Sequence, residues 1–277
     1  MQAISKPMSQ HIWNIRAELF DFHLPRVMGI VNFTPDSFAC RCTSMDEAGV
    51  LSATALQLSE GADIIDIGGC STRPNSQPVS AQEEWRRLAI ALTAVKKAFP
   101  AALISVDTFR AEIAERVIRE FGVDIINDIS GLADDKMLDV VARMRVPYIL
   151  MHNETLPPEL EEIDLMSHIV DFLARRLDRL HQAGVRDVAV DPGFGFGKTI
   201  EQNHTILRRL ADLRILDAPI LVGLSRKSMF YKPLGITPAE ALPATLEAQR
   251  VALRAGADIL RVHDVAAARA LINENIK

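Results

Sequence analysis

The residues in this sequence that could do chemistry recur at one kind of position, directly after a short apolar run. A single Asp or Asn at such a position is more often a helix cap or a turn former than a catalyst. Eight such positions in one chain favour a single shared site. They are Asn32, Gly68 with Gly69, Asp107, Asn127 with Asp128, His152, Asp191, Ser225 with Arg226 and Lys227, and Arg261 with His263.

The residue types at these positions indicate two kinds of ligand chemistry. Asp107, Asn127 and Asp191 suit a ligand rich in N–H donors and ring acceptors, such as a fused amino-heterocycle. Cationic side chains suit a phosphate or pyrophosphate group. The candidates for that role are Arg73, Lys227, Arg261 and His263. We therefore expect a polar heterocycle to bind deep in the site and an anion to bind at its mouth.

The segment from Asp191 to Thr199 is rich in glycine and superficially similar to a phosphate-binding loop. That motif requires Gly, four residues and then Gly-Lys-Ser/Thr, and Pro192 stands where its first Gly belongs. An ATPase is therefore disfavoured. We expect the glycines to bring the backbone close to a flat ligand, with Phe196 as a wall of the site.

The elements that must position these residues alternate between short apolar runs and long amphipathic segments. Each run is nearly continuous in apolar residues, as in a strand that is covered on both faces. Eight alternations in about 250 residues predict an α/β fold, the (β/α)8 TIM barrel, with its chemistry at the carboxyl ends of the strands. The competing doubly wound sheet usually carries G-x-G-x-x-G after its first strand, and that motif is absent. The runs are Val27–Val31, Ile64–Ile67, Leu103–Val106, Ile125–Ile126, Tyr148–Met151, Val188–Val190, Ile220–Val222 and Ile259–Val262.

Four segments carry the end signals of helices. The starts are marked by an acidic first turn, by a Ser-x-x-Glu capping box and by a proline in the first turn. Some of the ends are marked by a glycine directly after the helix. The predicted helices are Asp46–Glu60, Ser80–Phe99, Asp164–Ala183 and Pro238–Ala255. We expect residues 1–277 to form one domain. Within it, residues 1–25 are expected to form a hairpin or plug over the bottom of the barrel.

Composition and charge exclude several classes of protein. Of the 277 residues, 48% are apolar and 24% are charged, which disfavours intrinsic disorder. A net charge of −5 argues against a general nucleic-acid binder. No apolar run approaches the roughly 20 residues of a membrane span, and the N-terminus has no secretory signal. We expect a cytoplasmic protein without a membrane or nucleic-acid partner.

Two long loops follow the first two strands and are candidate lids over the site. They span Pro35–Met45 and Gly69–Val79. The three cysteines, Cys40, Cys42 and Cys70, all lie in these loops. Three reduced thiols are favoured in the cytosol, whereas a disulfide between the loops under oxidation and a zinc site are less favoured alternatives.

Taken together, eight segments between Arg26 and Val265 resemble the dihydropteroate synthase family, in order and at barrel spacing. The segments are Met28–Phe38, Gly61–Gly69 with Ser71–Pro74, Ser105–Phe109, Asn127–Gly131, Met151 with His152, Asp191–Lys198, Gly223–Ser228 and Arg261–Asp264. The resemblance implies a folate-pathway transferase. It would join p-aminobenzoate to 6-hydroxymethyl-7,8-dihydropterin pyrophosphate, giving 7,8-dihydropteroate and pyrophosphate.

The resemblance also implies roles for individual residues. The pterin would be held by Asp107, Asn127, Asp191 and Lys227, with Met151, Gly223 and Ser225 also contacting substrate. Asn32, Arg261 and His263 would hold the pyrophosphate, and Asn32 would also reach a Mg2+ cofactor. Phe38, Thr72, Arg73, Pro74, Phe196 and Ser228 would shape the p-aminobenzoate pocket. The catalytic group would be Asp107, Asp191, Lys227 and Arg73, and the family implies a homodimer.

The two long loops depart from the family pattern. Cys70 stands where Glu is common, Asn75 where Gly is usual, and 39–42 read Ala-Cys-Arg-Cys instead of Ser-Asp-Gly-Gly. Two alternatives therefore stay open. One is a pterin-binding methyltransferase that acts on methyl-tetrahydrofolate, which has no use for Ser-Thr-Arg-Pro. The other is a non-enzymatic pterin-binding paralogue with degenerate lids.

Overall fold

Eight parallel strands form a barrel in the computed structural model, which describes residues 11–33, 46–70 and 79–276. The strand order is β8-β7-β6-β5-β4-β3-β10-β9. The ring closes between β8 and β9, where Val190 pairs with Ile220 and its N–H donates to the Pro219 carbonyl at 2.8 Å. The (β/α)8 prediction is confirmed. The strands are β3 (Arg26–Asn32), β4 (Ile64–Gly68), β5 (Leu103–Asp107), β6 (Ile125–Asp128), β7 (Tyr148–Met151), β8 (Val188–Asp191), β9 (Leu221–Val222) and β10 (Ile259–Val262).

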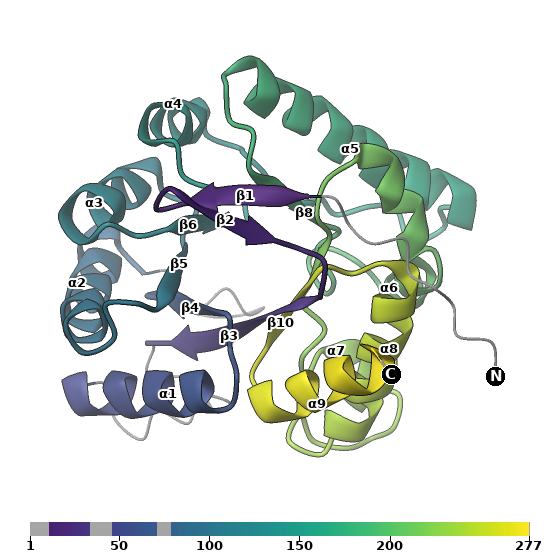
Figure 1. The fold of residues 1–277 in the computed structure, drawn as a ribbon. Helices are drawn as coiled ribbons and strands as arrows, with labels where there is room; N and C mark the ends of the chain where they lie inside the picture. Colours follow the sequence, from purple (N-terminus) through teal and green to yellow (C-terminus); the bar gives the residue numbers. More distant parts are fainter. Residues whose placement is uncertain (1–10, 34–45, 71–78, 277) are drawn as a thin grey trace.

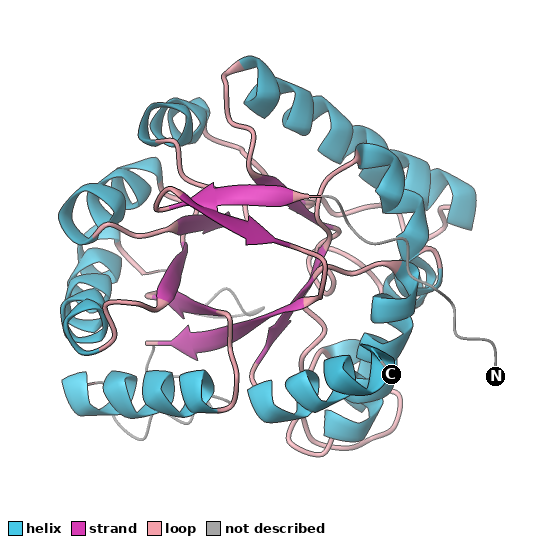
Figure 2. Cartoon of the chain, viewed as in Figure 1, coloured by secondary structure: helices cyan, strands magenta, loops and turns pink. Residues whose placement is uncertain are grey.

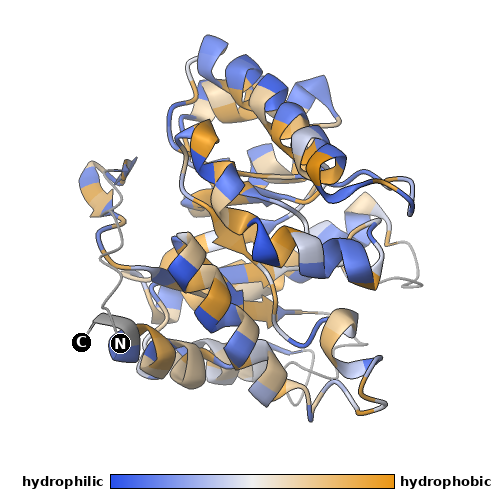
Figure 3. Ribbon diagram, turned by 90° about the vertical axis from the view of Figure 1, so that its right-hand side faces the viewer, coloured by the Kyte–Doolittle hydropathy of each residue, from blue (hydrophilic) through white to orange (hydrophobic). Residues whose placement is uncertain are grey.

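Helices surround this barrel on the outside (Figures 1 and 2). Hydrophilic and hydrophobic residues alternate along them, as expected for helices that cover a core on one face (Figure 3). The helices are α1 (Glu47–Ser59), α2 (Ala81–Ala98), α3 (Ala111–Phe121), α4 (Asp135–Met144), α5 (Glu162–Gln182), α6 (Ile200–Arg208), α7 (Ser228–Tyr231), α8 (Leu242–Ala255) and α9 (Val265–Ile276), with a 3-10 helix at Leu210–Leu216. None of the helices in the described part of the chain combines the length and the apolarity that a membrane crossing needs.

The predicted helix starts differ from the structure in three details. Helix α5 begins at Glu162, two residues before the predicted Asp164. Ser80 caps α2, but the Glu83 carboxylate bonds Arg86 and Arg87, so only half of the predicted capping box forms there. Helix α8 begins at Leu242 rather than at the predicted Pro238. The reason is Pro243, which lacks an N–H and is tolerated only in the first turn of a helix.

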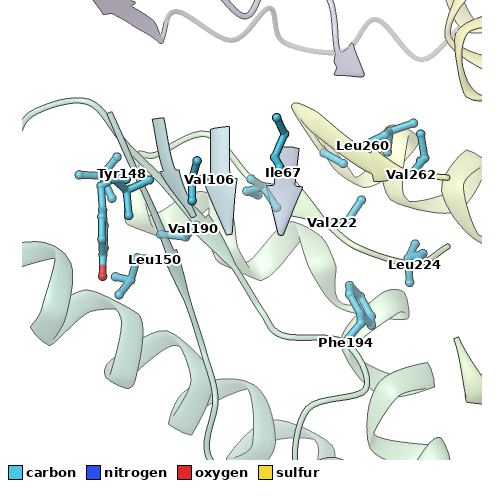
Figure 4. Close-up of a cluster of buried hydrophobic side chains, with 14 of the residues drawn as sticks. Ile67, Val106, Tyr148, Leu150, Val190, Phe194, Val222, Leu224, Leu260 and Val262 are labelled. Atoms are coloured by element: carbon cyan, nitrogen blue, oxygen red, sulfur yellow. The ribbon is translucent and has the colours of Figure 1, made fainter. Parts of the chain in front are cut away.

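Outward-pointing strand residues pack against the helices and form the main core. Figure 4 shows part of this layer, including Val106, Leu150 and Val190. Successive residues of a strand point to opposite faces, so their immediate neighbours point into the barrel. At the amino-terminal end of the strands these inward residues are apolar. They are Met28, Ile64, Ile125, Ile149, Ala189, Leu221 and Ile259, with Leu103 packed beside them.

An N-terminal hairpin lies across that end of the barrel (Figure 1). It consists of β1 (Ile12–Ile15) and β2 (Glu18–Asp21), joined by Arg16 and Ala17, whose φ values are 54° and 61°. Trp13, Ile15 and Phe22 are buried against the inward apolar residues. The predicted hairpin over the barrel bottom is confirmed for residues 11–25, and residues 1–10 of that prediction lie outside the described ones.

The tip of the hairpin is fixed by a charged contact. Arg16 donates to both carboxylate oxygens of Asp124 at 2.6 and 2.7 Å, and to the carbonyls of Pro100 and Ala102. Asp124 in turn accepts from the Ile104 N–H at 2.8 Å. The hairpin is therefore bonded to the segments that lead into β5 and β6.

Candidate active site

On five of the eight strands, β4, β5, β6, β8 and β10, the inward side chain changes from apolar to polar two residues further along. Residues two apart on a strand point to the same face. Asp66 therefore points into the barrel like Ile64, and Asp191 points into it like Ala189. The residues of this second inward layer are Asp66, Ser105, Asn127, Met151, Asp191, Gly223 and Arg261. Above them at the carboxyl end lie Asn32, Gly68, Asp107, Ser225 and His263. The strand ends thus bring most of the predicted site residues to one end of the barrel.

Arg261 holds the acids of this layer together. Its Nε donates to Asp66 Oδ2 and its Nη2 to Asp107 Oδ2, both at 2.7 Å, and Asn127 Nδ2 donates to Asp66 Oδ2 at 3.1 Å. The sequence predicts Arg261 at the mouth of the site with the other cations. In the structure it lies one layer deeper than His263, since β10 turns both side chains inward two residues apart.

Burial controls the protonation of the acids. It raises the pKa of Asp107 to about 7, which the nearby Arg261 charge opposes and the Asp66 and Glu84 charges reinforce. Burial also raises the pKa of Asp191, although its Oδ1 accepts a hydrogen bond from the Gly193 N–H at 2.7 Å. Both carboxyl groups therefore gain a proton more readily than an exposed aspartate does.

Lys227 lies opposite Asp191 and against the glycine-rich loop. Its ammonium is 4.5 Å from the centroid of the Phe196 ring. A Cβ on Gly195 would come within 3.1 Å of the Lys227 Cδ, so this glycine leaves room for the lysine. Burial lowers the pKa of Lys227 to about 8, and the Asp191 charge opposes the shift.

The glycine-rich loop is organised by its own lysine. The Lys198 ammonium donates to the carbonyls of His152, Gly193 and Phe196 at 3.0 to 3.3 Å. Gly193 has a φ of 72°, and a Cβ there would lie 2.0 Å from the His152 carbonyl oxygen. In a phosphate-binding loop this ammonium would bind the ligand, but here it is hydrogen-bonded to backbone carbonyls. This agrees with the absence of the complete phosphate-binding motif from the sequence.

The rim of the site is completed by the segment after β9. Ser225 Oγ lies 3.0 Å from His263 Nδ1, which ties that segment to the end of β10. Arg226 makes a two-pronged pair with Asp264 at 2.7 and 3.1 Å, and Ser228 begins helix α7. These bonds hold the backbone on either side of Lys227.

Two smaller residues mark open or crowded parts of the site. A Cβ on Gly223 would meet nothing within 4 Å, so the second inward layer has empty space at β9. A Cβ on Gly68 would come within 3.2 Å of Asn32 Oδ1 and 3.7 Å of the Asp107 Cβ. Asn32 therefore lies at the rim beside Asp107.

Two strand-end residues do not join the site. Asp128 follows the inward-facing Asn127 and points outward, where its carboxylate accepts hydrogen bonds from the Ser130 and Leu132 N–H groups at 2.7 and 3.2 Å and from the Tyr148 hydroxyl. His152 points outward, because it follows the inward-facing Met151, and its ring packs 4.6 Å from that of Phe172 on α5. The expectation that Asp128 and His152 share the polar face is therefore wrong.

Several predicted residues lie outside the described ones. They are Phe38, Cys40, Cys42, Thr72, Arg73 and Pro74. The described residues on either side of 71–78 are held by arginines, since Arg87 donates to the Gly69 carbonyl and Arg110 to that of Val79. Cys70 is half-buried, and burial raises the pKa of its thiol.

Two acids near the site were missed by reasoning from the sequence. Asp66 lies within an apolar strand run, and only the period of two along β4 would have pointed it inward. Glu84 lies on the buried face of α2, where it accepts a hydrogen bond from Thr108 at 2.7 Å and pairs with Arg110. The signal for Glu84 was a charged residue on the face of a helix that packs against the barrel.

Comparison with known proteins gives a consistent result. Residues 28–263 match the model of the pterin-binding enzymes. The dihydropteroate synthase of Escherichia coli is 38% identical over 251 residues, which is 88% of each chain. The same enzyme from Coxiella burnetii, solved with pteroic acid, is 35% identical with a TM-score of 0.87, covering 96% of this chain and 97% of that one.

A third comparison concerns a structure solved with a different ligand. The dihydropteroate synthase of Xanthomonas albilineans, solved with 4-aminobenzoic acid, is 37% identical with a TM-score of 0.86, and the match covers 95% of this chain and 96% of that one. The match to the family model, from residue 28 to residue 263, includes every strand end described above. The chain belongs to the dihydropteroate synthase family of pterin-binding enzymes.

Proposed function

We propose that this transferase joins p-aminobenzoate to 6-hydroxymethyl-7,8-dihydropterin pyrophosphate, releasing pyrophosphate and forming 7,8-dihydropteroate. The observation that carries the proposal is the polar group at the carboxyl end of the barrel, where Asn127 and Asp191 of the second inward layer lie below Asp107, with Lys227 and Arg261 beside them. Such a group of acceptors matches the amidine-like edge of a pterin.

The pterin is held by buried carboxylates in this proposal. Asp191 accepts from the Gly193 N–H through Oδ1, which orients Oδ2 toward the ligand. A bound N–H edge favours the ionised form of Asp107, whose pKa of about 7 leaves it part-protonated at neutral pH. Lys227 donates to a ring acceptor, with its methylenes against Gly195 and its ammonium over Phe196. Met151 and Gly223 supply close apolar and backbone contact.

The pyrophosphate occupies the rim. His263, positioned by Ser225, and Asn32 face it there, and Arg261 extends its positive charge from below. A carboxamide oxygen such as Asn32 Oδ1 fits Mg2+, which commonly uses one or two protein oxygens together with substrate phosphates. When bound, the ion would neutralise charge on the leaving group.

Catalysis then needs stabilisation of positive charge rather than a strong base. If pyrophosphate leaves before the amine attacks, the pterin carbon becomes cationic, and the ionised Asp107 and Asp191 stabilise it in a site of low dielectric. The arylamine of p-aminobenzoate is a sufficient nucleophile. Phe196 and Ser228 line its pocket, which Phe38, Thr72, Arg73 and Pro74 complete in this proposal.

The proposal is tested by measuring pyrophosphate release with both substrates, with p-aminobenzoate omitted, and with Mg2+ removed by a chelator. We expect release that depends on p-aminobenzoate and on Mg2+. A chain that binds the pterin pyrophosphate but releases nothing would be a binding paralogue. Release without p-aminobenzoate would indicate hydrolysis and would contradict the proposed transfer.

We propose further that the chain acts in the cytoplasm as a homodimer, as its family implies. Sedimentation velocity of the purified chain tests the assembly. A monomer at micromolar concentration would contradict it.

A further inference from the structure

Two histidines and a glutamate cluster between β7 and α5, on the helix side of the barrel. His152 directly follows β7, Glu154 comes two residues later, and His168 lies on α5. One ligand atom from each of the three side chains lies within 4.8 Å of the other two. The cluster is separate from the inward acids, because His152 points away from the barrel interior.

His152 is the unusual member of this cluster. Its side chain is fully buried, and neither ring nitrogen has a hydrogen-bond partner among the described residues. Buried polar atoms are normally satisfied, so two unpaired nitrogens on one ring point to a partner beyond the protein's own side chains. Burial, reinforced by the Lys198 charge, lowers the pKa of His152 to about 3.

We infer that His152, Glu154 and His168 form a binding site for Zn2+ or another divalent cation of the same borderline class. Two imidazoles and a carboxylate are a set of ligands that Zn2+ takes in proteins, with water in the fourth position. Ligand atoms around one tetrahedral zinc are about 3.4 Å apart, and those of the three side chains lie within 4.8 Å of one another, so they must converge by up to about 1.4 Å. Glu154 and His168 are 41% and 42% exposed, which gives an ion and its water access from solvent.

The neighbouring cations leave the proposed ligand atoms available. Arg176 lies 3.9 Å from Glu154 Oε1, whereas the other oxygen, Oε2, lies 3.8 Å from His168 Nε2. The Lys198 ammonium is directed to three backbone carbonyls. Arg176 therefore faces one carboxylate oxygen of Glu154, and Lys198 faces the loop backbone, so neither cation points into the space between the three ligands.

A cation at this site would stabilise the segment of the rim that contains Asp191. The backbone N–H of His152 donates to the Asp191 carbonyl at 2.8 Å, and the His152 carbonyl accepts from the Lys198 ammonium. Joining His152 to α5 through an ion would therefore fix β7, β8 and the glycine-rich loop together. Since an ion that binds only the folded state stabilises it, the melting temperature should rise with its concentration.

The test uses the full chain without an affinity tag, titrated with Co2+ and with Zn2+ alone. Calorimetry measures affinity and stoichiometry, and visible absorption of Co2+ reports its coordination. The variants are His168→Gln and Glu154→Gln, both at partly exposed positions, with His181→Gln on the same helix as the matched control. Melting without metal checks that each variant folds as the wild type does.

We expect one equivalent of ion, tetrahedral Co2+ absorption, and affinity weakened roughly tenfold or more in both variants but not in His181→Gln. The metal-dependent rise in melting temperature should disappear in the same two variants. The inference is overturned if binding does not saturate, if both variants bind as the wild type does, or if Co2+ shows the intense near-ultraviolet bands of thiolate ligation.

Discussion

The two ends of the barrel are built by the same strands but carry opposite inward side chains. At the bottom the inward ring is apolar and the hairpin covers it with Trp13, Ile15 and Phe22. Two residues further along each strand the inward ring contains acids, an amide and an arginine. The bottom therefore contributes burial of apolar surface, whereas the top keeps buried charges close together.

This difference shows how one backbone pattern serves both stability and function. Buried charges cost free energy unless they are paired, and at the top a single guanidinium pairs two carboxylates. The closed apolar bottom stabilises the strands whose other ends carry these groups. Changes at the bottom should therefore alter stability, and changes at the top should alter binding and catalysis.

The largest effect is expected from Trp13→Ala at the bottom. Trp13 is buried against Phe22 and the apolar ring, so its removal should lower the free energy of unfolding by about 3–5 kcal/mol. Denaturant unfolding measures the change, and turnover per folded molecule should stay the same. Leu19→Ala in the same hairpin is the control, because Leu19 is 77% exposed. A comparable loss of unfolding free energy in both variants would contradict the packing of Trp13 against the barrel bottom.

The next largest effect is expected from Asp191→Asn at the top. The substitution keeps size but removes charge-assisted hydrogen bonds to the pterin, worth about 1.5–3 kcal/mol. Titration with pterin pyrophosphate should show this loss, with little change in the melting temperature. Asp139→Asn on the exposed side of α4 serves as the control. Wild-type affinity in Asp191→Asn would remove this residue from the pterin site.

A third prediction separates the two substrates. The sequence predicts Arg73 in the loop after the second strand run and not at a strand end, so Arg73→Ala should leave pterin affinity within about threefold, under 1 kcal/mol. Turnover should fall and the requirement for p-aminobenzoate should rise, because the lost interaction acts on loop closure and the transition state. Steady-state kinetics with both substrates varied tests this. Unchanged constants would mean that Arg73 does not contact substrate.

The smallest effect is expected in the pH dependence of kcat/KM. Asp107 must lose its proton and Lys227 must keep its own, so activity should rise through pH about 7 and fall through about 8. Asp66 is a like charge that raises the pKa of Asp107, and Asp66→Asn should move the acidic limb to lower pH. A limb that stays in place would show that Asp107 is not the titrating group.

Much of the site could be predicted from the sequence because most of its residues directly follow an apolar run, which is a local pattern. Strands buried on both faces read as apolar runs, and a polar residue after such a run stands out. Asn127 and Asp191 were found in this way. Asp66 was missed because it lies inside an apolar run, where its neighbours in the sequence do not distinguish a site residue from any other polar residue. Glu84 was missed because a helix pattern does not tell which strand end its buried face meets.

By itself, the sequence determined the strand runs, their alternation and the residues that end them, since these depend on neighbours within a few positions. Only the tertiary structure decided how deep each side chain lies and which charges meet. Arg261 was predicted at the mouth and lies among the acids, and His152 was predicted in the site and packs against α5. Barrel closure between β8 and β9 joins residues near 190 and 220, and pairing over that separation leaves no mark in a local pattern. The physical reason is that direction and depth follow from strand register and ring closure, which are properties of the whole barrel.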